Sequence, residues 1–274
     1  MRQWTRTAAI GLAALPWIVA ASLSQVRAQD GAARTALKPA VFQASGPSVA
    51  SIQATVDEFR FALGAANNGN APGPLPSGRR EINWDGGGSA TTSLAATPFA
   101  GFLLTRGALF ATPGSGFVQA PATGLAETFA NASYATGFRA FSAVRLFSPL
   151  DSNVTDVQFF VPGSGHLPAT TRGFGAVFAD VDQPDGGGPG SKRGNRGAST
   201  LIRCYAEDGR LLYSSFVPAS PGEATVSFLG IVFDAAQIAR VRITSGEVAP
   251  GADDDERDVV VMDDFLFGEP QLAQ

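Results

Sequence analysis

The sequence predicts an all-β protein: a single antiparallel β-sandwich of jelly-roll type with little helix. Three observations lead to this prediction. The 274 residues include 32 glycines and 18 prolines, short apolar runs recur along the chain, and turn-forming residues separate nearly all of these runs. Abundant glycine and proline favour turns and short strands over helices. Apolar runs divided in this way are typical of a sandwich or barrel.

The predicted strands share an apolar or alternating character and lie at 101–110, 116–119, 140–147, 154–161, 174–181, 199–206, 210–217, 224–233, 238–244 and 259–267. A further short strand, rich in polar groups, is expected within 78–86. Residues 49–63 combine two patterns: the first half favours a short helix, and 59–63 alternates like a strand. No internal repeat or domain boundary is visible, so one domain is expected.

The first 28 residues have the pattern of a secretory signal peptide. A short basic segment precedes an apolar run over 8–23, and Val26-Arg27-Ala28 fits the small-x-small cleavage rule. The alternative is an uncleaved anchor, but an apolar run of about 16 residues is shorter than the ~20 that span a bilayer. We therefore expect a signal peptide at 1–28, a flexible lead-in at 29–50 and the β-sandwich domain at 51–270. The mature protein would be secreted or periplasmic, with no membrane span.

Charge and cysteine content restrict the classes of partner and chemistry. The chain has 20 basic and 24 acidic residues, a formal net charge of −4, and its arginines are scattered. This balance argues against nucleic acid and anionic membranes as partners. The single cysteine, Cys204, cannot form an intramolecular disulfide, and its strand-like surroundings predict a packed thiol.

Several blocks resemble a group of uncharacterised bacterial exported β-sandwich proteins, namely 59–64, 78–86, 152–157, 173–182 and 259–265. The resemblance spans nearly the whole mature chain and implies a fold without implying an activity. A weaker resemblance links the ending Met262-Asp263-Asp264-Phe265 to jelly-roll carbohydrate-binding and lectin-like modules. In that family one aspartate of such an ending helps to hold a structural calcium ion, which the resemblance implies here for Asp263 or Asp264.

The two adjacent carboxylates of Asp263 and Asp264 interrupt an otherwise apolar strand. Successive strand residues face opposite sides, so at least one carboxylate is expected on a buried face. There it must be neutralised, hydrogen-bonded or bound to a cation. Calcium prefers clustered oxygen ligands, and Asp180 and Asp182 at the end of another predicted strand are further candidates. The alternative is that such acids pair with arginines, for example Arg60, or cap turns.

Asn83-Trp84-Asp85 combines the groups that bind sugars: an aromatic ring for the apolar face of a sugar, flanked by side chains for its hydroxyls. The alternative is that Trp84 anchors the core, as a lone tryptophan of a sandwich often does. The only histidine, His166, lies in a Pro/Gly-rich loop and excludes multi-histidine metal sites. We expect it to be an exposed loop residue.

These observations predict a secreted, non-enzymatic binding module. Its expected ligand is a polysaccharide or cell-surface glycan, bound at the cell envelope or outside the cell, and calcium is the expected stabilising cofactor. One alternative is a structural or adhesive surface or matrix protein. Another is a glycan-active hydrolase that uses a carboxylate pair, for example Asp180 with Asp264.

Overall fold

The computed structural model describes residues 38–182, 200–253 and 257–273, within one compact unit, Leu37–Gln274. The predicted signal peptide at 1–28 lies outside the described residues. Within the described ranges, no helix is both long and apolar enough to cross a membrane.

The larger sheet contains β1 (Ala40–Gly46), β2 (Arg79–Ile82), β3 (Ser93–Ala96), β5 (Gly116–Ala120), β6 (Leu146–Leu150), β9 (Gly173–Ala179), β12 (Val226–Val232) and β14 (Val261–Gly268). Its strands follow the order β1-β12-β9-β14-β6-β5-β3, and β2 also pairs with β14. Every pairing between these described strands is antiparallel.

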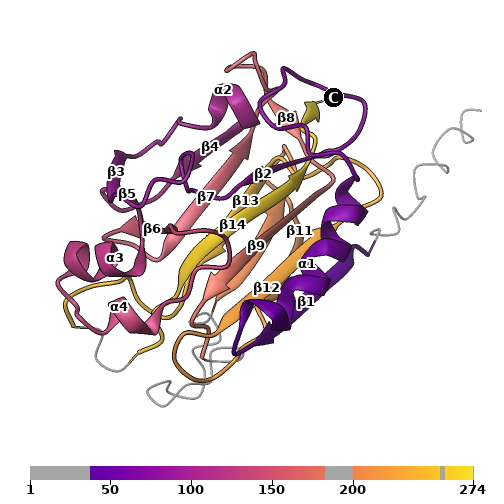
Figure 1. Ribbon diagram of the computed structural model, residues 1–274. Helices are drawn as coiled ribbons and strands as arrows, with labels where there is room; N and C mark the ends of the chain where they lie inside the picture. Colours follow the sequence, from indigo (N-terminus) through magenta and orange to yellow (C-terminus); the bar gives the residue numbers. More distant parts are fainter. Residues whose placement is uncertain (1–37, 183–199, 254–256, 274) are drawn as a thin grey trace, which may run out of the picture. The chain divides into compact units, whose positions relative to one another are not determined.

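The smaller sheet contains β4 (Ala108–Ala111), β7 (Val154–Phe159), β10 (Leu201–Tyr205), β11 (Leu211–Phe216) and β13 (Arg240–Thr244). Its order is β11-β10-β13-β7-β4, again with antiparallel pairings. Two short strands, β8 (Ala169–Thr170) and β15 (Gln271–Leu272), pair with each other near the end of the chain (Figure 1).

The two sheets share one hydrophobic core. In β9, Phe174 and Phe178 belong to the same buried cluster as Val157 of β7 and Val241 of β13. Side chains alternate along a strand, so these residues define the inner faces of the two stacked sheets. The prediction of an antiparallel all-β architecture is thus confirmed. The strand orders do not confirm the jelly-roll connectivity.

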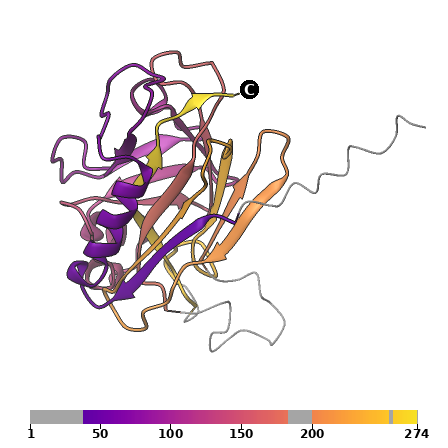
Figure 2. The same ribbon diagram turned by 90° about the vertical axis from the view of Figure 1, so that its right-hand side faces the viewer.

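Helix α1 (Val49–Leu63) covers the outer face of the larger sheet, on the side opposite the β10–β11 hairpin (Figure 2). Its residues Ile52, Val56, Phe59 and Leu63 are buried against β9 and β12. This spacing places all four on one side of a helix. The strand predicted for 59–63 is therefore wrong, because the helix continues to Leu63.

Part of the predicted flexible lead-in at 29–50 is regular structure. Residues 40–46 form β1, which pairs with β12 along its whole length. Helix α1 then begins at Val49. The prediction is therefore corrected for these residues, whose backbone is fixed by hydrogen bonds to a strand far away in the sequence.

The part of the chain that the structure describes contains three further, short helices: α2 (Leu103–Arg106), α3 (Ala122–Phe129) and α4 (Tyr134–Gly137). Helix α2 lies within the predicted strand 101–110. That prediction is therefore right only for the end of the range, where β4 begins at Ala108. Helices α3 and α4 pack through Leu125, Phe129 and Tyr134 in a second apolar cluster beside β5 and β6. The central strands β9, β12 and β14 of the larger sheet are thereby buried on both faces.

Candidate functional site

The paired aspartates of the last long strand lie at a β-bulge. The register of β14 against β9 shifts between Met262 and Phe265, the two residues that flank Asp263 and Asp264. A bulge breaks the regular alternation of side chains. Consequently both carboxylates are buried, with residue exposures of 0% for Asp263 and 3% for Asp264.

Asp263 is held by hydrogen bonds. One carboxylate oxygen, Oδ2, accepts from the backbone N–H groups of Phe141 at 2.6 Å and Ser142 at 3.3 Å. The carbonyl oxygen of Asp263 accepts from the indole N–H of Trp84 at 2.8 Å. Burial, and then the charge of Asp264, raise the pKa of the Asp263 carboxyl well above its ordinary value.

Asp264 belongs to an ion-pair network instead. Its Oδ2 lies 3.5 Å from Nη2 of Arg60. The same nitrogen is 3.1 Å from Glu81, and Nη1 of Arg60 is 2.9 Å from Asp57. Its Oδ1 is buried and has no hydrogen-bond partner among the described residues. Burial raises the pKa of Asp264 as well. The alternative prediction, pairing with Arg60, is thus what the structure shows for Asp264, whereas Asp263 is held by backbone N–H groups.

Trp84 does not form an exposed platform. Its exposure is 0%, and its ring stacks on Phe147 with centroids 3.7 Å apart and an angle of 2° between the planes. The sugar-binding role predicted for Trp84 is therefore corrected: the ring is part of the core.

Asp85, the neighbour of Trp84, is buried too. One of its oxygens accepts from the backbone N–H groups of Val144 at 2.9 Å and Arg145 at 2.8 Å. The Ser142 hydroxyl donates toward Asp85 Oδ2 at 3.4 Å and toward Asp263 Oδ1 at 3.4 Å. Only Asn83 of the predicted binding triplet is exposed. These groups build a structural network that fixes a loop.

Asp180 and Asp182 lie in a different place, at the end of β9. The Asp180 backbone has a φ of +69°, and burial, followed by the charges of Asp182 and Asp258, raises the pKa of its carboxyl to about 7. Asp182 accepts a hydrogen bond from the Gly222 N–H at 2.9 Å. Throughout 38–182, 200–253 and 257–273, no three His, Cys, Asp or Glu side chains form a group able to hold a metal ion. The calcium site stays a prediction.

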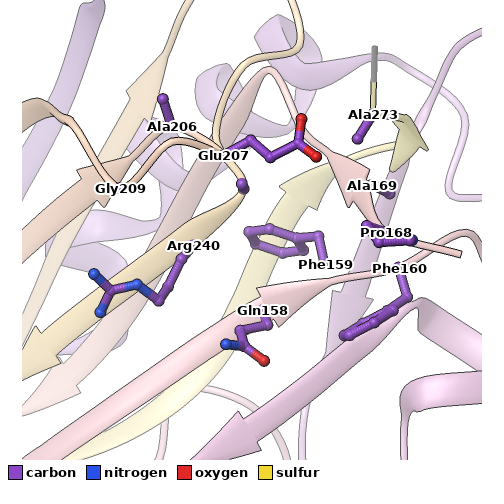
Figure 3. A pocket seen from close by; sticks show the side chains of 11 residues that line it. Gln158, Phe159, Phe160, Pro168, Ala169, Ala206, Glu207, Gly209, Arg240 and Ala273 are labelled. Atoms are coloured by element: carbon purple, nitrogen blue, oxygen red, sulfur yellow. The ribbon is translucent and has the colours of Figure 1, made fainter. Parts of the chain in front are cut away.

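A pocket of about 270 Å³ opens at one end of the smaller sheet, as Figure 3 shows. Its polar lining comes from Gln158, Glu207 and Arg240, and its apolar lining includes Phe160 and Pro168. A broader hollow of about 700 Å³ shares Ala206 and Glu207 with this pocket and continues to Gln237 and Leu272. The two hollows are therefore adjacent on the surface.

The outer face of the smaller sheet carries the polar groups that lead into this pocket; we call it the open face. In β10, Ile202 and Cys204 point into the core, so Arg203 and Tyr205 point outward. In β13, Val241 and Ile243 are in the core, which leaves Arg240 and Arg242 outside. Figure 2 shows helix α1 on the opposite side of the molecule from the β10–β11 hairpin, with no helix over the outer side of that hairpin.

Asp156 of β7 binds two of these arginines. Its carboxylate accepts from Arg240 at 2.9 Å and from Arg242 at 2.6 and 3.0 Å. The guanidinium of Arg240 also lies 4.1 Å from the centre of the Tyr205 ring, a cation–π contact. The sequence contained one signal for this face, the alternation Arg240-Val241-Arg242-Ile243-Thr244, which predicts a strand with arginines on one side.

Two minor expectations are confirmed. His166 is exposed in its loop, and its Nδ1 contacts the Ser164 carbonyl. Cys204 is buried with 0% exposure, and burial raises the pKa of its thiol to about 12, so the thiol is unreactive at neutral pH.

No protein family model, curated protein or solved structure matches this chain. Its function must therefore be argued from its own geometry.

Proposed function

We propose that this protein is a non-enzymatic binding module for carbohydrate, and that the ligand lies along the open face and in the pocket at its end. The observation that carries the proposal is the contrast between the two sheets. The central strands β9, β12 and β14 of the larger sheet are buried on both faces, whereas the smaller sheet presents polar side chains on one face that lead into a pocket. With its predicted signal peptide, the module would act in the periplasm or outside the cell.

The pocket offers the mixture of surfaces that a sugar requires. Ligand sites combine apolar walls with a few polar groups that fix orientation. Phe160 and Pro168 supply apolar contact for the carbon face of a sugar ring. Gln158, Glu207 and Arg240 supply donors and acceptors for its hydroxyl groups.

The geometry favours binding over hydrolysis. A glycosidase needs two carboxylates that face each other across a cleft. Asp264, one member of the predicted pair, is 3% exposed and lies beside Arg60 under helix α1. A substrate cannot reach it without displacing the helix.

Affinity electrophoresis of the chain from Gln29 onward, in gels containing single neutral or acidic polysaccharides, tests the proposal. We expect retardation by at least one polymer. Gln158→Ala should weaken that binding about two- to tenfold, because it removes one exposed hydrogen-bonding group of the pocket. The matched control is Glu58→Ala, an exposed position of α1 on the opposite side of the molecule. Lack of retardation by every polymer, or equal effects of the two variants, would contradict the proposal.

A further inference from the structure

We infer that the ligand of the open face is a polysaccharide that carries carboxylate groups, and that Arg203, Arg242 and Arg240 bind it. We call these three residues the arginine row. The inference rests on the proposed binding function and narrows it to one chemical class. It starts from the register of three neighbouring strands.

The register brings the charged side chains of the open face together. Arg203 of β10 is directly opposite Arg242 of β13, and Arg242 is directly opposite Asp156 of β7. Adjacent strands are about 4.8 Å apart, so these three side chains occupy one short line across the sheet. Arg240, two residues along β13 from Arg242, lies beside this line and also lines the pocket.

The charges on this line do not balance. Three guanidinium groups face one carboxylate, that of Asp156, which already binds Arg240 and Arg242. Arg203 has no acidic partner among the described residues. Two like charges directly opposite each other on neighbouring strands are destabilising. A sheet that keeps Arg203 opposite Arg242 therefore has a local excess of positive charge that an anionic ligand would neutralise.

The local charge differs from the charge of the whole chain. The net charge of −4 argues against anionic partners when it is averaged over the surface. Binding, however, depends on the field near the site, which decays over about 10 Å at ordinary ionic strength. The net charge of the whole chain therefore does not decide which ligand the open face binds.

The chemistry of arginine indicates which anion is preferred. A guanidinium group presents paired N–H donors that match the two oxygens of a carboxylate. Arg242 makes this kind of contact with Asp156, through Nε at 3.0 Å and Nη2 at 2.6 Å. The side chains of Arg240 and Arg242 remain 28% and 40% exposed and can contact a ligand.

The arrangement also favours a sugar polymer over a simple acidic chain. Glu207 lines the pocket at one end of the row, together with Phe160 and Gln158. A carboxylate there repels anionic groups but accepts hydrogen bonds from hydroxyls. A ligand that is acidic along part of its length and rich in hydroxyls elsewhere fits both ends.

Isothermal titration of the chain from Gln29 onward with polygalacturonate, and with the same polymer methyl-esterified, tests the inference. Methylation removes the charge and keeps the sugar backbone. We expect binding of the acidic form only. Arg203→Gln should weaken it about tenfold, the effect of losing one charge-assisted contact. The control is Arg210→Gln, on the turn of the same hairpin, where Arg210 faces Asp208 at 3.8 Å and is 60% exposed. It should change affinity less than about twofold.

Other outcomes separate this inference from the proposed function. Equal binding of both polymer forms, or an unchanged affinity of Arg203→Gln, overturns the inference and leaves a carbohydrate-binding module. Preference for dextran sulfate over polygalacturonate overturns the carboxylate assignment. Equally tight binding of poly-L-glutamate would show that the open face recognises negative charge whatever the polymer backbone, and it overturns the polysaccharide assignment. Binding of no polysaccharide at all overturns both proposals.

Discussion

The ion pair between Arg80 and Glu269 joins β2 to the segment after β14. Two guanidinium nitrogens of Arg80 donate to the two carboxylate oxygens of Glu269, each at 2.7 Å. The exposures of the two side chains are 0% and 2%. The third nitrogen of Arg80 donates to the carbonyls of Gly69 and Thr105, so the charge is fully surrounded by partners.

Removal of Glu269 should strongly destabilise the fold. In Glu269→Ala the Arg80 charge stays buried without its counter-ion, and we expect a loss of about 3–5 kcal/mol in the free energy of unfolding. Urea unfolding followed by circular dichroism measures it. The control is Asp208→Ala, whose partner Arg210 is 3.8 Å away and whose side chain is 67% exposed; less than about 1 kcal/mol should be lost there. Similar losses in both variants would refute the structural role given to the buried pair.

Helix α1 lies close to the larger sheet because two glycines leave room for Phe59. Gly175 of β9 and Gly230 of β12 are partners in the sheet register. A Cβ atom added at Gly230 would be 2.5 Å from the Phe59 ring, and one at Gly175 would be 2.7 Å from it. The ring therefore rests on bare backbone at the centre of the helix–sheet contact.

Gly230→Ala should force helix and sheet apart. Because overpacking of a filled core costs about 1–3 kcal/mol, we expect a loss of that size in the free energy of unfolding. The matched control is Gly137→Ala in α4, where an added Cβ meets no atom within 4 Å. That change should stay within about 0.5 kcal/mol of the wild type. Chemical denaturation compares the two variants, and equal stabilities would show that Phe59 can move aside.

The same helix shows how far the sequence could predict the elements. Most strands were predictable because their apolar runs and flanking turns are local signals. The end of α1 was not, since Phe59-Arg60-Phe61-Ala62-Leu63 alternates like a strand while Ile52, Val56, Phe59 and Leu63 follow a helical spacing. The helical pattern prevails because Gly175 and Gly230 leave room for the Phe59 ring. These glycines lie in strands far from α1 in the sequence, so a local pattern does not reveal them.

At the scale of the whole molecule, the burial of Asp263 or Asp264 was predictable, and Arg60 was an expected partner, but the backbone partners of Asp263 were not predictable. These backbone partners come from the loop before β6, which only the tertiary fold brings to β14. The arginine row was missed for the same reason: it depends on the register of β10, β13 and β7. Trp84 was assigned to a ligand site because residue type alone does not report burial.

The buried carboxylates should make the stability of the molecule depend on pH. The pKa values of Asp180, Asp263 and Asp264 are all raised in the folded state, so these groups hold protons more tightly there than in the unfolded chain. The contribution of these three groups to stability is therefore greatest at low pH and is lost as the pH rises through their folded pKa values. For Asp180 this window runs from its ordinary pKa of 3.8 to about 7.

We expect the free energy of unfolding to fall between pH 5 and 7, by at most about 1.4 kcal/mol per pH unit for each proton released. Asp180→Asn keeps the shape of the side chain without the titrating group, so it should flatten this slope and stabilise the protein most at pH 8. The control is Asp151→Asn, because Asp151 has a similarly positive φ of 56° but is exposed. Any relief of backbone strain by asparagine should therefore be similar in Asp151→Asn and Asp180→Asn. Asp151→Asn should keep the wild-type dependence of stability on pH. Denaturant unfolding across the pH range measures the free energy of unfolding of both variants. If the slope in Asp180→Asn equals that of the wild type, the prediction for Asp180 is wrong and the titrating groups are those of the Asp263–Asp264 pair.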